Sequence, residues 1–198
     1  MVSHVTLGSM TSRPPESPIP QLTSVDAVLR AAVEMFLRDG WIDARALAAA
    51  AGIGRSTLYR RYGDRTRILG EVIWVIATAG FEDIRRECGG QGAAGVAEIV
   101  RRSLHLAAGY PAMRTFVAQH TDTALKVLTS RDGVIQRRFV ASIAQVIRED
   151  VGEPDDIDAH TLAYAIVRIG ESFYFRELIT GEPDDIDAAA AVIRRLLE

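Results

Sequence analysis

The chain has 198 residues, of which 48% are hydrophobic and 25% are charged, and its formal net charge is −3. These are ordinary values for a soluble globular protein of one or two domains. No apolar run reaches the roughly 18 residues that a membrane-spanning helix needs, and no basic region followed by a long apolar run marks a signal peptide. We therefore expect a cytoplasmic protein with no membrane contact.

The charges are unevenly distributed along the chain. Residues 1–70 hold nine arginines and six acidic residues, whereas residues 71–198 hold 14 basic and 20 acidic residues. A basic N-terminal part on an acidic remainder is typical of a protein that meets nucleic acid with one end. The single cysteine, Cys88, excludes an intrachain disulfide and a cysteine-based metal site. We interpret it as an incidental, partly exposed thiol, with redox sensing as the alternative.

Residues 1–22 contain four prolines and several serines and threonines, which predicts a disordered tail. A basic arm that reaches DNA is the alternative, although Arg13 is its only arginine. From Thr23 onward apolar residues recur at helical spacing. Thr23 and Asp26 form a candidate capping box, and Gly40 ends the first helix.

Six further segments have helical periodicity between recognisable start and stop residues. We expect short helices from Asp43 to Ala51 and from Arg55 to Tyr62, and longer ones from Asp64 to Cys88, from Ala93 to Ala108, from Ala112 to His120 and from Asp122 to Val151, the last with a candidate interruption at 131–133. The octapeptide GEPDDIDA occurs at 152–159 and again at 181–188, and it predicts two more helix starts, at Asp155 and Asp184. A calcium loop is the alternative for this repeat, but the EF-hand spacing and its distal glutamate are missing, so we expect no metal.

No segment shows sustained two-residue alternation, so the expected fold is all-α, with about nine helices. We predict a disordered tail (1–22), a three-helix helix-turn-helix DNA-binding head (23–70), and a larger α-helical body for effector binding and dimerisation (71–198).

The stretch 47–69 has the physical properties that a helix-turn-helix requires. Ala48 and Ala51 are small enough for two helices to cross closely, and Gly52 tolerates the positive φ of the turn. Five arginines lie between Arg55 and Arg67, with Asp64 as the one acidic residue there. A merely solvated helix face would carry charges of both signs, whereas arginine with interleaved threonine and tyrosine suits phosphates and base edges.

The sequence of 48–69, AAAAGIGRSTLYRRYGDRTRIL, resembles the DNA-binding head of the TetR family of bacterial regulators. The resemblance implies a dimer on a palindromic double-stranded DNA operator, most commonly as a repressor. We expect no enzymatic activity and no cofactor. It implies phosphate contacts for Thr57, Tyr59 and Arg65, with base-reading candidates Arg55, Ser56 and either Arg60 or Arg61. Gly54, Ser56 and a shortened link after Gly40 depart from the family pattern, so the base-reading register stays open.

The body has two apolar helical stripes that the resemblance places in a dimer interface, although ordinary core is the alternative reading of each. The predicted interface residues are Leu162, Ile166, Ile169, Phe173, Ala189, Ile193, Leu196 and Leu197. A small-molecule effector pocket is expected between the long helix after the head and the helices that follow, again with core as the alternative for each aromatic residue. The predicted lining residues are Trp74, Thr78, Phe81, His105, Met113, Phe116, His120, Phe139, Tyr164, Arg168, Glu171 and Tyr174.

The segment 168–185, RIGESFYFRELITGEPDD, is similar to the C-terminal domains of quorum-signal-degradation regulators of the QsdR type. That narrower resemblance implies a lactone effector, such as an acyl-homoserine lactone or a γ-butyrolactone. Two other classes of function compete with a regulator. An enzyme is disfavoured because no nucleophile–base pair, phosphate loop or metal-spaced cluster is evident. A helical adaptor is the second, and a steep salt dependence of DNA binding would separate it from a regulator.

Overall fold

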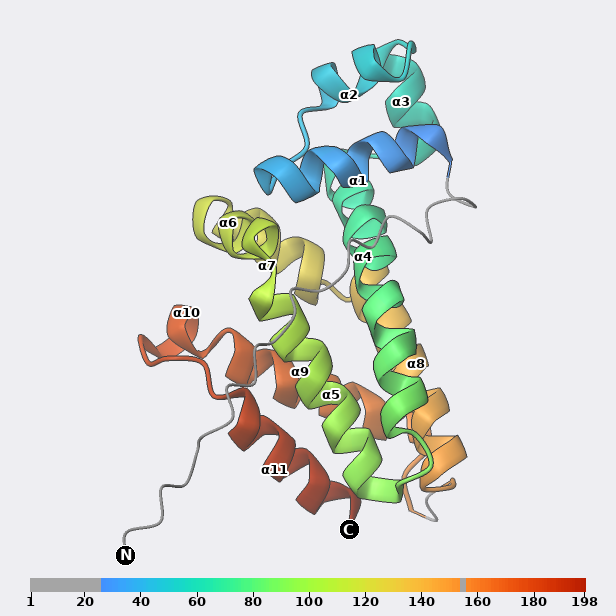
Figure 1. The fold of residues 1–198 in the computed structure, drawn as a ribbon, viewed down its shortest axis with the longest axis vertical. Coiled ribbons are helices and arrows are strands. Elements are labelled where there is room, and N and C mark those ends of the chain that lie inside the picture. Colours follow the sequence, from blue (N-terminus) through green and yellow to red (C-terminus); the bar gives the residue numbers. More distant parts are fainter. Residues whose placement is uncertain (1–25, 154–155) are drawn as a thin grey trace, which may run out of the picture.

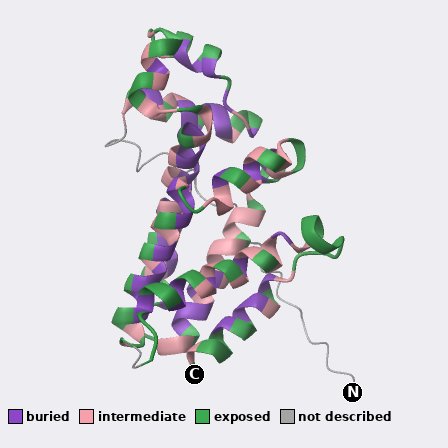
Figure 2. Ribbon diagram, turned by 180° about the vertical axis from the view of Figure 1, so that it is seen from behind, coloured by how far each residue is buried: buried purple, intermediate pink, exposed green. Residues whose placement is uncertain are grey.

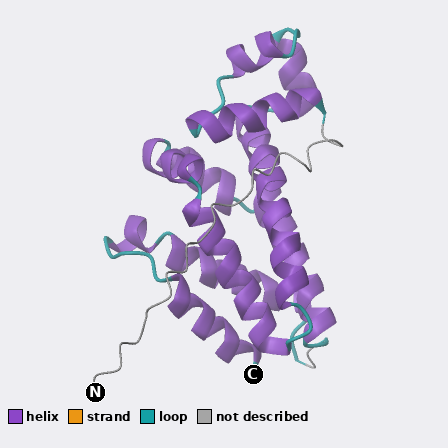
Figure 3. Ribbon diagram, in the orientation of Figure 1, coloured by secondary structure: helices purple, strands orange, loops and turns teal. Residues whose placement is uncertain are grey.

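The computed structural model describes residues 26–153 and 156–198, and every regular element in these two ranges is a helix (Figures 1 and 3). The helices are α1 (Ala27–Asp39), α2 (Ala44–Ala50), α3 (Arg55–Tyr62), α4 (Arg65–Cys88), α5 (Gly92–Gly109), α6 (Pro111–Gln119), α7 (Thr121–Thr129), α8 (Val134–Asp150), α9 (Ala159–Tyr174), α10 (Arg176–Thr180) and α11 (Ile186–Leu197). The all-α fold with a three-helix head is confirmed. The predicted tail, Thr23 and Asp155 lie outside the described residues.

The described ranges hold eleven helices rather than about nine, for two local reasons. The candidate interruption at 131–133 is confirmed and divides the segment 122–151 into α7 and α8, because the chain turns there, where the Gly133 N–H donates to the Ser130 carbonyl at 2.9 Å. The five-residue α10 follows α9 after Phe175 and ends at Gly181, whose φ is 77°. A helix of five residues has no apolar periodicity of its own, so the sequence pattern does not reveal α10.

Aspartate side chains cap the N-termini of α1, α2 and the long α4. Asp43 accepts a hydrogen bond from the Ala46 N–H at 2.7 Å, as its predicted capping role requires, and Asp64 accepts one from the Arg67 N–H at 2.8 Å. The start of α1 differs from the prediction. Asp26 is itself the N-cap, accepting from the Val28 N–H at 2.8 Å, so the helix begins one turn later than a capping box at Thr23 would place it.

The head lies at one end of the long helix α4 (Figure 1). α5, α7 and α8 pack against the rest of α4, and α9 and α11 pack on α5. The buried faces of these helices point inward, while exposed residues follow their outer faces (Figure 2). One core cluster joins α1–α3 to the first half of α4 and also includes Met113 and Phe116 of α6. A second cluster joins the end of α4 to α5, α8, α9 and α11. The hydrophobic core of the head therefore continues into the body through α6.

The two copies of GEPDDIDA start their helices at different positions of the repeat. In the first copy the seventh residue, Asp158, is the N-cap of α9 and accepts from the His160 and Thr161 N–H groups. In the second copy the fifth residue, Asp185, is the N-cap of α11 and accepts from the Ala188 N–H at 3.0 Å. The predicted helix starts at Asp155 and Asp184 are therefore both wrong: the cap of α9 lies three residues later, at Asp158, and the cap of α11 lies one residue later, at Asp185.

Burial explains the difference between the two copies. Ile186, the sixth residue of the second copy, is 3% exposed and packs as the first residue of α11, whereas the equivalent Ile157 is 40% exposed. Several aspartates in the repeat can act as a cap, and the packing of the isoleucine selects which of them does.

Candidate DNA-binding surface and effector pocket

The head holds α3 so that its polar face points to solvent. Leu58 is fully buried and anchors α3 against the head core, and Gly52 adopts the predicted positive φ, 65°. Arg55, Ser56 and Arg60 are exposed. Thr57 and Tyr59 are half-buried at the edges of this face. Gly54, the N-cap of α3, makes no side-chain capping bond, which leaves N–H groups at the start of the helix available to a phosphate.

The two adjacent arginines of α3 differ in their contacts. Arg61 pairs with Asp26 at 2.7 Å, which ties the end of α3 to the start of α1. The Val28 N–H, and then other groups including the Arg61 cation, lower the pKa of Asp26, so the carboxylate stays ionised. No carboxylate among the described residues pairs with Arg60. Arg60 is therefore the better base-reading candidate of the two.

Arg65, at the first position of α4, lies against the loop between α1 and α2. Its guanidinium lies 5.1 Å from the ring centroid of Trp41, in a cation–π contact, and its Nε is buried without a hydrogen-bond partner among the described residues. Trp41 in turn stacks on His120, the residue that follows α6, with ring centroids 3.8 Å apart. Trp41 therefore lies between a predicted phosphate contact and the body, a role that sequence analysis missed because the residue stands outside any helical pattern.

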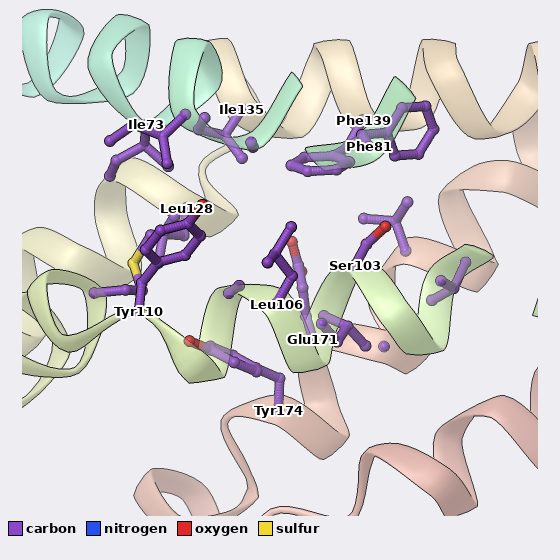
Figure 4. Close-up of a pocket in the computed structure, with 18 of the residues that line it drawn as sticks. Ile73, Phe81, Ser103, Leu106, Tyr110, Leu128, Ile135, Phe139, Glu171 and Tyr174 are labelled. Atoms are coloured by element: carbon purple, nitrogen blue, oxygen red, sulfur yellow. The ribbon is translucent and has the colours of Figure 1, made fainter. Parts of the chain in front are cut away.

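An apolar cavity lies in the body, between α4, α5, α8 and α9, with α6 and α7 at the end nearer the head. Figure 4 shows side chains from these helices pointing into it. Its volume is about 140 Å³, which is room for on the order of ten water-sized groups. Five residues predicted for the effector pocket line it, namely Phe81, Met113, Phe139, Glu171 and Tyr174.

Seven residues predicted for the pocket do not line the cavity. Phe116 is fully buried between Phe36 and Trp41, and His120 stacks on Trp41. Trp74 packs edge-on against Phe139 from outside the cavity. The Thr78 hydroxyl donates to the Trp74 carbonyl, and His105 pairs with Asp187 on the surface. Tyr164 is 51% exposed. Arg168 donates to the Thr129 carbonyl and to Glu171.

One reason explains why most of these seven residues lie outside the cavity. A helical pattern tells which residues share a face, but it does not tell which neighbour that face meets. Sequence analysis also missed Tyr110, a cavity residue that stands between α5 and α6 just before Pro111. Cys88 is buried rather than partly exposed, and the Arg102 guanidinium donates to its sulfur at 3.3 Å.

The family model described as tetracyclin repressor-like, C-terminal domain, matches residues 91–198, more than half of the chain. The chain belongs to the TetR family. Among solved structures, it is similar to the R. erythropolis transcriptional repressor QsdR, itself of the TetR family, with a TM-score of 0.74 and 25% identity over 86% of this chain and 92% of that one. No curated protein sequence matches the chain.

Membership of the TetR family makes this protein a transcriptional regulator. No helix in the described ranges is long and apolar enough to cross a membrane. Within 26–153 and 156–198, no three His, Cys, Asp or Glu side chains are grouped so that they could hold a metal ion.

In this TetR-family chain, the residues predicted for a dimer interface fall into two groups. Leu162, Ile166, Ala189 and Ile193 are buried within the protomer and form its own core, so they are not available to a partner. Ile169, Phe173 and Leu197 are half-buried, and Leu196 is exposed. The same two helices expose other large apolar side chains that the prediction omitted, Tyr164 of α9 and Val192 of α11.

Proposed function

We propose that this regulator is a repressor that binds a palindromic DNA operator as a homodimer and leaves it when a small effector enters the cavity. The observation that carries the proposal is the course of α4. The first turn of α4 presents Arg65 beside the cationic face of α3, and its middle lines the cavity through Ile73 and Phe81. An occupant of the cavity can thus shift the head through one continuous helix.

The head (23–70) would then read DNA and the body (71–198) would bind effector and partner. Arg55, Ser56 and Arg60 would face base edges, while Thr57, Tyr59 and Arg65 would contact phosphates. Arg61, already paired with Asp26, would add to the positive field of this surface. The two heads of a dimer would have to stand about 34–36 Å apart to enter successive major grooves.

Selection of bound sequences from a random DNA pool tests this function. We expect an inverted repeat with half-sites about 10 base pairs apart, and an affinity that falls steeply with salt. Failure to enrich any sequence, with no salt dependence of DNA binding, would instead favour the helical adaptor.

The effector that we propose is a lactone with an acyl chain, which the resemblance of 168–185 to quorum-signal-degradation regulators implies. The mostly apolar lining and the few polar groups of the cavity support a ligand of this type. Titration of acyl-homoserine lactones and γ-butyrolactones into the operator complex tests the class. No release of DNA at any soluble concentration would contradict it.

The exposed apolar residues of α11 provide a test of the dimer. We expect the double substitution Val192→Glu and Leu196→Glu to weaken dimerisation at least tenfold, because it places charges in an apolar interface. Sedimentation over a range of protein concentrations measures the change. Both side chains are nearly half exposed in the protomer, so its helical circular dichroism should not change.

Leu178→Glu on α10 is a matched control, because Leu178 is exposed to the same degree, 45%. We expect it to leave the dimer intact. A wild-type chain that sediments as a monomer at micromolar concentration would rule out the dimer, and a double variant that remains dimeric would place the interface on another surface.

The stack of Trp41 on His120 provides a test of how the cavity communicates with the head. α6 lines the cavity through Met113, and His120, the residue that follows α6, stacks on Trp41 of the α1–α2 loop. Gly40 is pressed so closely against α6 that a Cβ there would lie 2.8 Å from the Ala112 carbonyl oxygen. We expect the Trp41→Ala variant to bind N-hexanoyl homoserine lactone as the wild type does. The factor by which bound lactone lowers operator affinity should be smaller by about fivefold or more in this variant.

The measurement compares lactone affinity, by calorimetry, with the lactone concentration that releases labelled operator. His120→Phe is the control, because a phenyl ring can keep the stack on Trp41, and it should keep the wild-type coupling. If Trp41→Ala releases operator as the wild type does, communication runs through α4 alone.

A further inference from the structure

The polar groups of the cavity carry information about the ligand head group beyond its general class. Glu171 extends from α9 toward the middle of the cavity beside Leu106, with Tyr110 and Tyr174 to one side and Phe81 and Phe139 to the other (Figure 4). Its side chain is only 17% exposed. A carboxyl group in so apolar a surrounding is costly unless its oxygens find partners.

One of the two carboxyl oxygens of Glu171 already has a partner. Arg168 donates to Oε2 at 2.7 Å and also to the Thr129 carbonyl at 3.2 Å, so the guanidinium is fixed outside the cavity. No group among the described residues donates to Oε1. The second oxygen is therefore an acceptor that the protein itself leaves unused within an apolar cavity.

The charge around Glu171 argues against a cationic ligand. Arg168 already balances the carboxylate from outside the cavity. A cation on Oε1 would therefore be a second, uncompensated positive charge buried in apolar surroundings. Burial raises the pKa of Glu171 to about 7, although Arg168 acts in the opposite direction. Near neutral pH, a neutral ligand that donates a hydrogen bond to Oε1 would therefore favour the ionised carboxylate.

Tyr110 and Tyr174 provide hydrogen-bond donors in the cavity, whereas Glu171 provides an acceptor. Neither phenol makes a hydrogen bond to another described residue, and both line the cavity. Burial raises the pKa of Tyr174 to about 12 and also raises that of Tyr110, so both hydroxyls remain protonated and can donate. The remaining polar lining side chain, Ser103, donates to the Ile99 carbonyl of its own helix at 2.7 Å.

From this arrangement we infer that Glu171 selects neutral effectors that carry a hydrogen-bond donor, an amide N–H or a hydroxyl, beside an apolar chain. Oε1 accepts from the donor, the phenol of Tyr110 or Tyr174 donates to a ligand carbonyl, and the chain lies toward Phe81 and Phe139. This inference rests on the proposed function, since it names the head group of the ligand that fills the same cavity.

Two probes that differ in one atom test the inference on the full chain. N-hexanoyl homoserine lactone has an amide N–H, and its ester analogue, α-hexanoyloxy-γ-butyrolactone, has an oxygen at that position. Both probes have the same number of non-hydrogen atoms, so their size does not distinguish them. We expect calorimetry to show that the wild-type protein binds the amide roughly tenfold to a hundredfold more tightly, as for hydrogen bonds to charged groups.

Three variants assign the preference to a side chain. Glu171→Leu should bind the two probes within about twofold of each other, and Glu171→Gln, which keeps an acceptor oxygen without the charge, should show a preference reduced at least threefold. Ser103→Ala should keep the wild-type preference. Circular dichroism and operator binding establish that each variant folds. If the leucine variant does not fold, the glutamine variant alone tests the role of Glu171.

The outcomes separate this inference from the proposed function. Equal affinity of the wild-type protein for both probes overturns the donor requirement and leaves the lactone class standing. An unchanged preference in the Glu171 variants overturns the role of this residue. If neither probe binds while operator binding is intact, the lactone effector is wrong and the inference falls with it. Absence of operator binding is a failure of the proposed function alone, because the calorimetric comparison does not depend on DNA.

Discussion

Phe116→Ala is expected to lower the free energy of unfolding by about 3–5 kcal/mol, the usual cost of removing a fully buried phenylalanine. Phe116 is completely inaccessible, and its ring meets Phe36 of α1 edge-on, with centroids 5.6 Å apart, and lies 6.3 Å from Trp41. The substitution would leave a void where α6 meets the head. Urea unfolding at a fixed protein concentration measures the loss, since a dimer makes stability concentration-dependent.

Ile179→Ala is a suitable control, because Ile179 on α10 is 66% exposed and should contribute less than about 0.5 kcal/mol. The void in the Phe116 variant would also loosen the contact between α6 and the head. A loss below about 1 kcal/mol for Phe116→Ala would contradict its position as the central side chain between head and body.

Arg65→Ala is expected to weaken binding to operator and to random DNA alike, by roughly tenfold to a hundredfold at low salt. A charge-assisted phosphate contact contributes energy without reading sequence. The slope of log affinity against log salt should fall in magnitude by about 1. Trp41 holds the guanidinium in place, so little side-chain entropy is lost when it binds phosphate. Fluorescence anisotropy with both DNA types at several salt concentrations provides the measurement.

Arg55→Ala in the same assay should behave differently. Arg55 is exposed near the start of α3, with its guanidinium 6.0 Å from the Tyr59 ring centroid. Loss of a bidentate contact to guanine would reduce the preference for operator by about 1–3 kcal/mol, with a smaller effect on random DNA. Arg137→Ala, an exposed arginine of α8 in the body, serves as the charge-matched control and should change neither affinity. Equal losses for Arg55→Ala on both DNA types would rule out base reading by this residue.

Part of the candidate site follows from short stretches of sequence. The turn at Gly52, the exposed cationic face of α3 and the buried Leu58 depend on residues within one or two helical turns of one another. The family pattern of the head is of the same local kind. The effector pocket is different, because it is built from α4, α5, α8 and α9, and only five of twelve predicted residues line it.

What the sequence by itself determined about this protein is local: an all-α chain, caps at Asp43 and Asp64, the end of α1 at Gly40, and a cationic helix-turn-helix. A cap or a turn is formed by atoms two to four residues apart, so the neighbouring sequence specifies it. The tertiary structure alone decided that Ile166 and Ile193 face the protomer core rather than a partner, and that identical copies of GEPDDIDA start their helices at different aspartates. These choices depend on which apolar surface each helix meets, and helices that are distant in the sequence supply that surface.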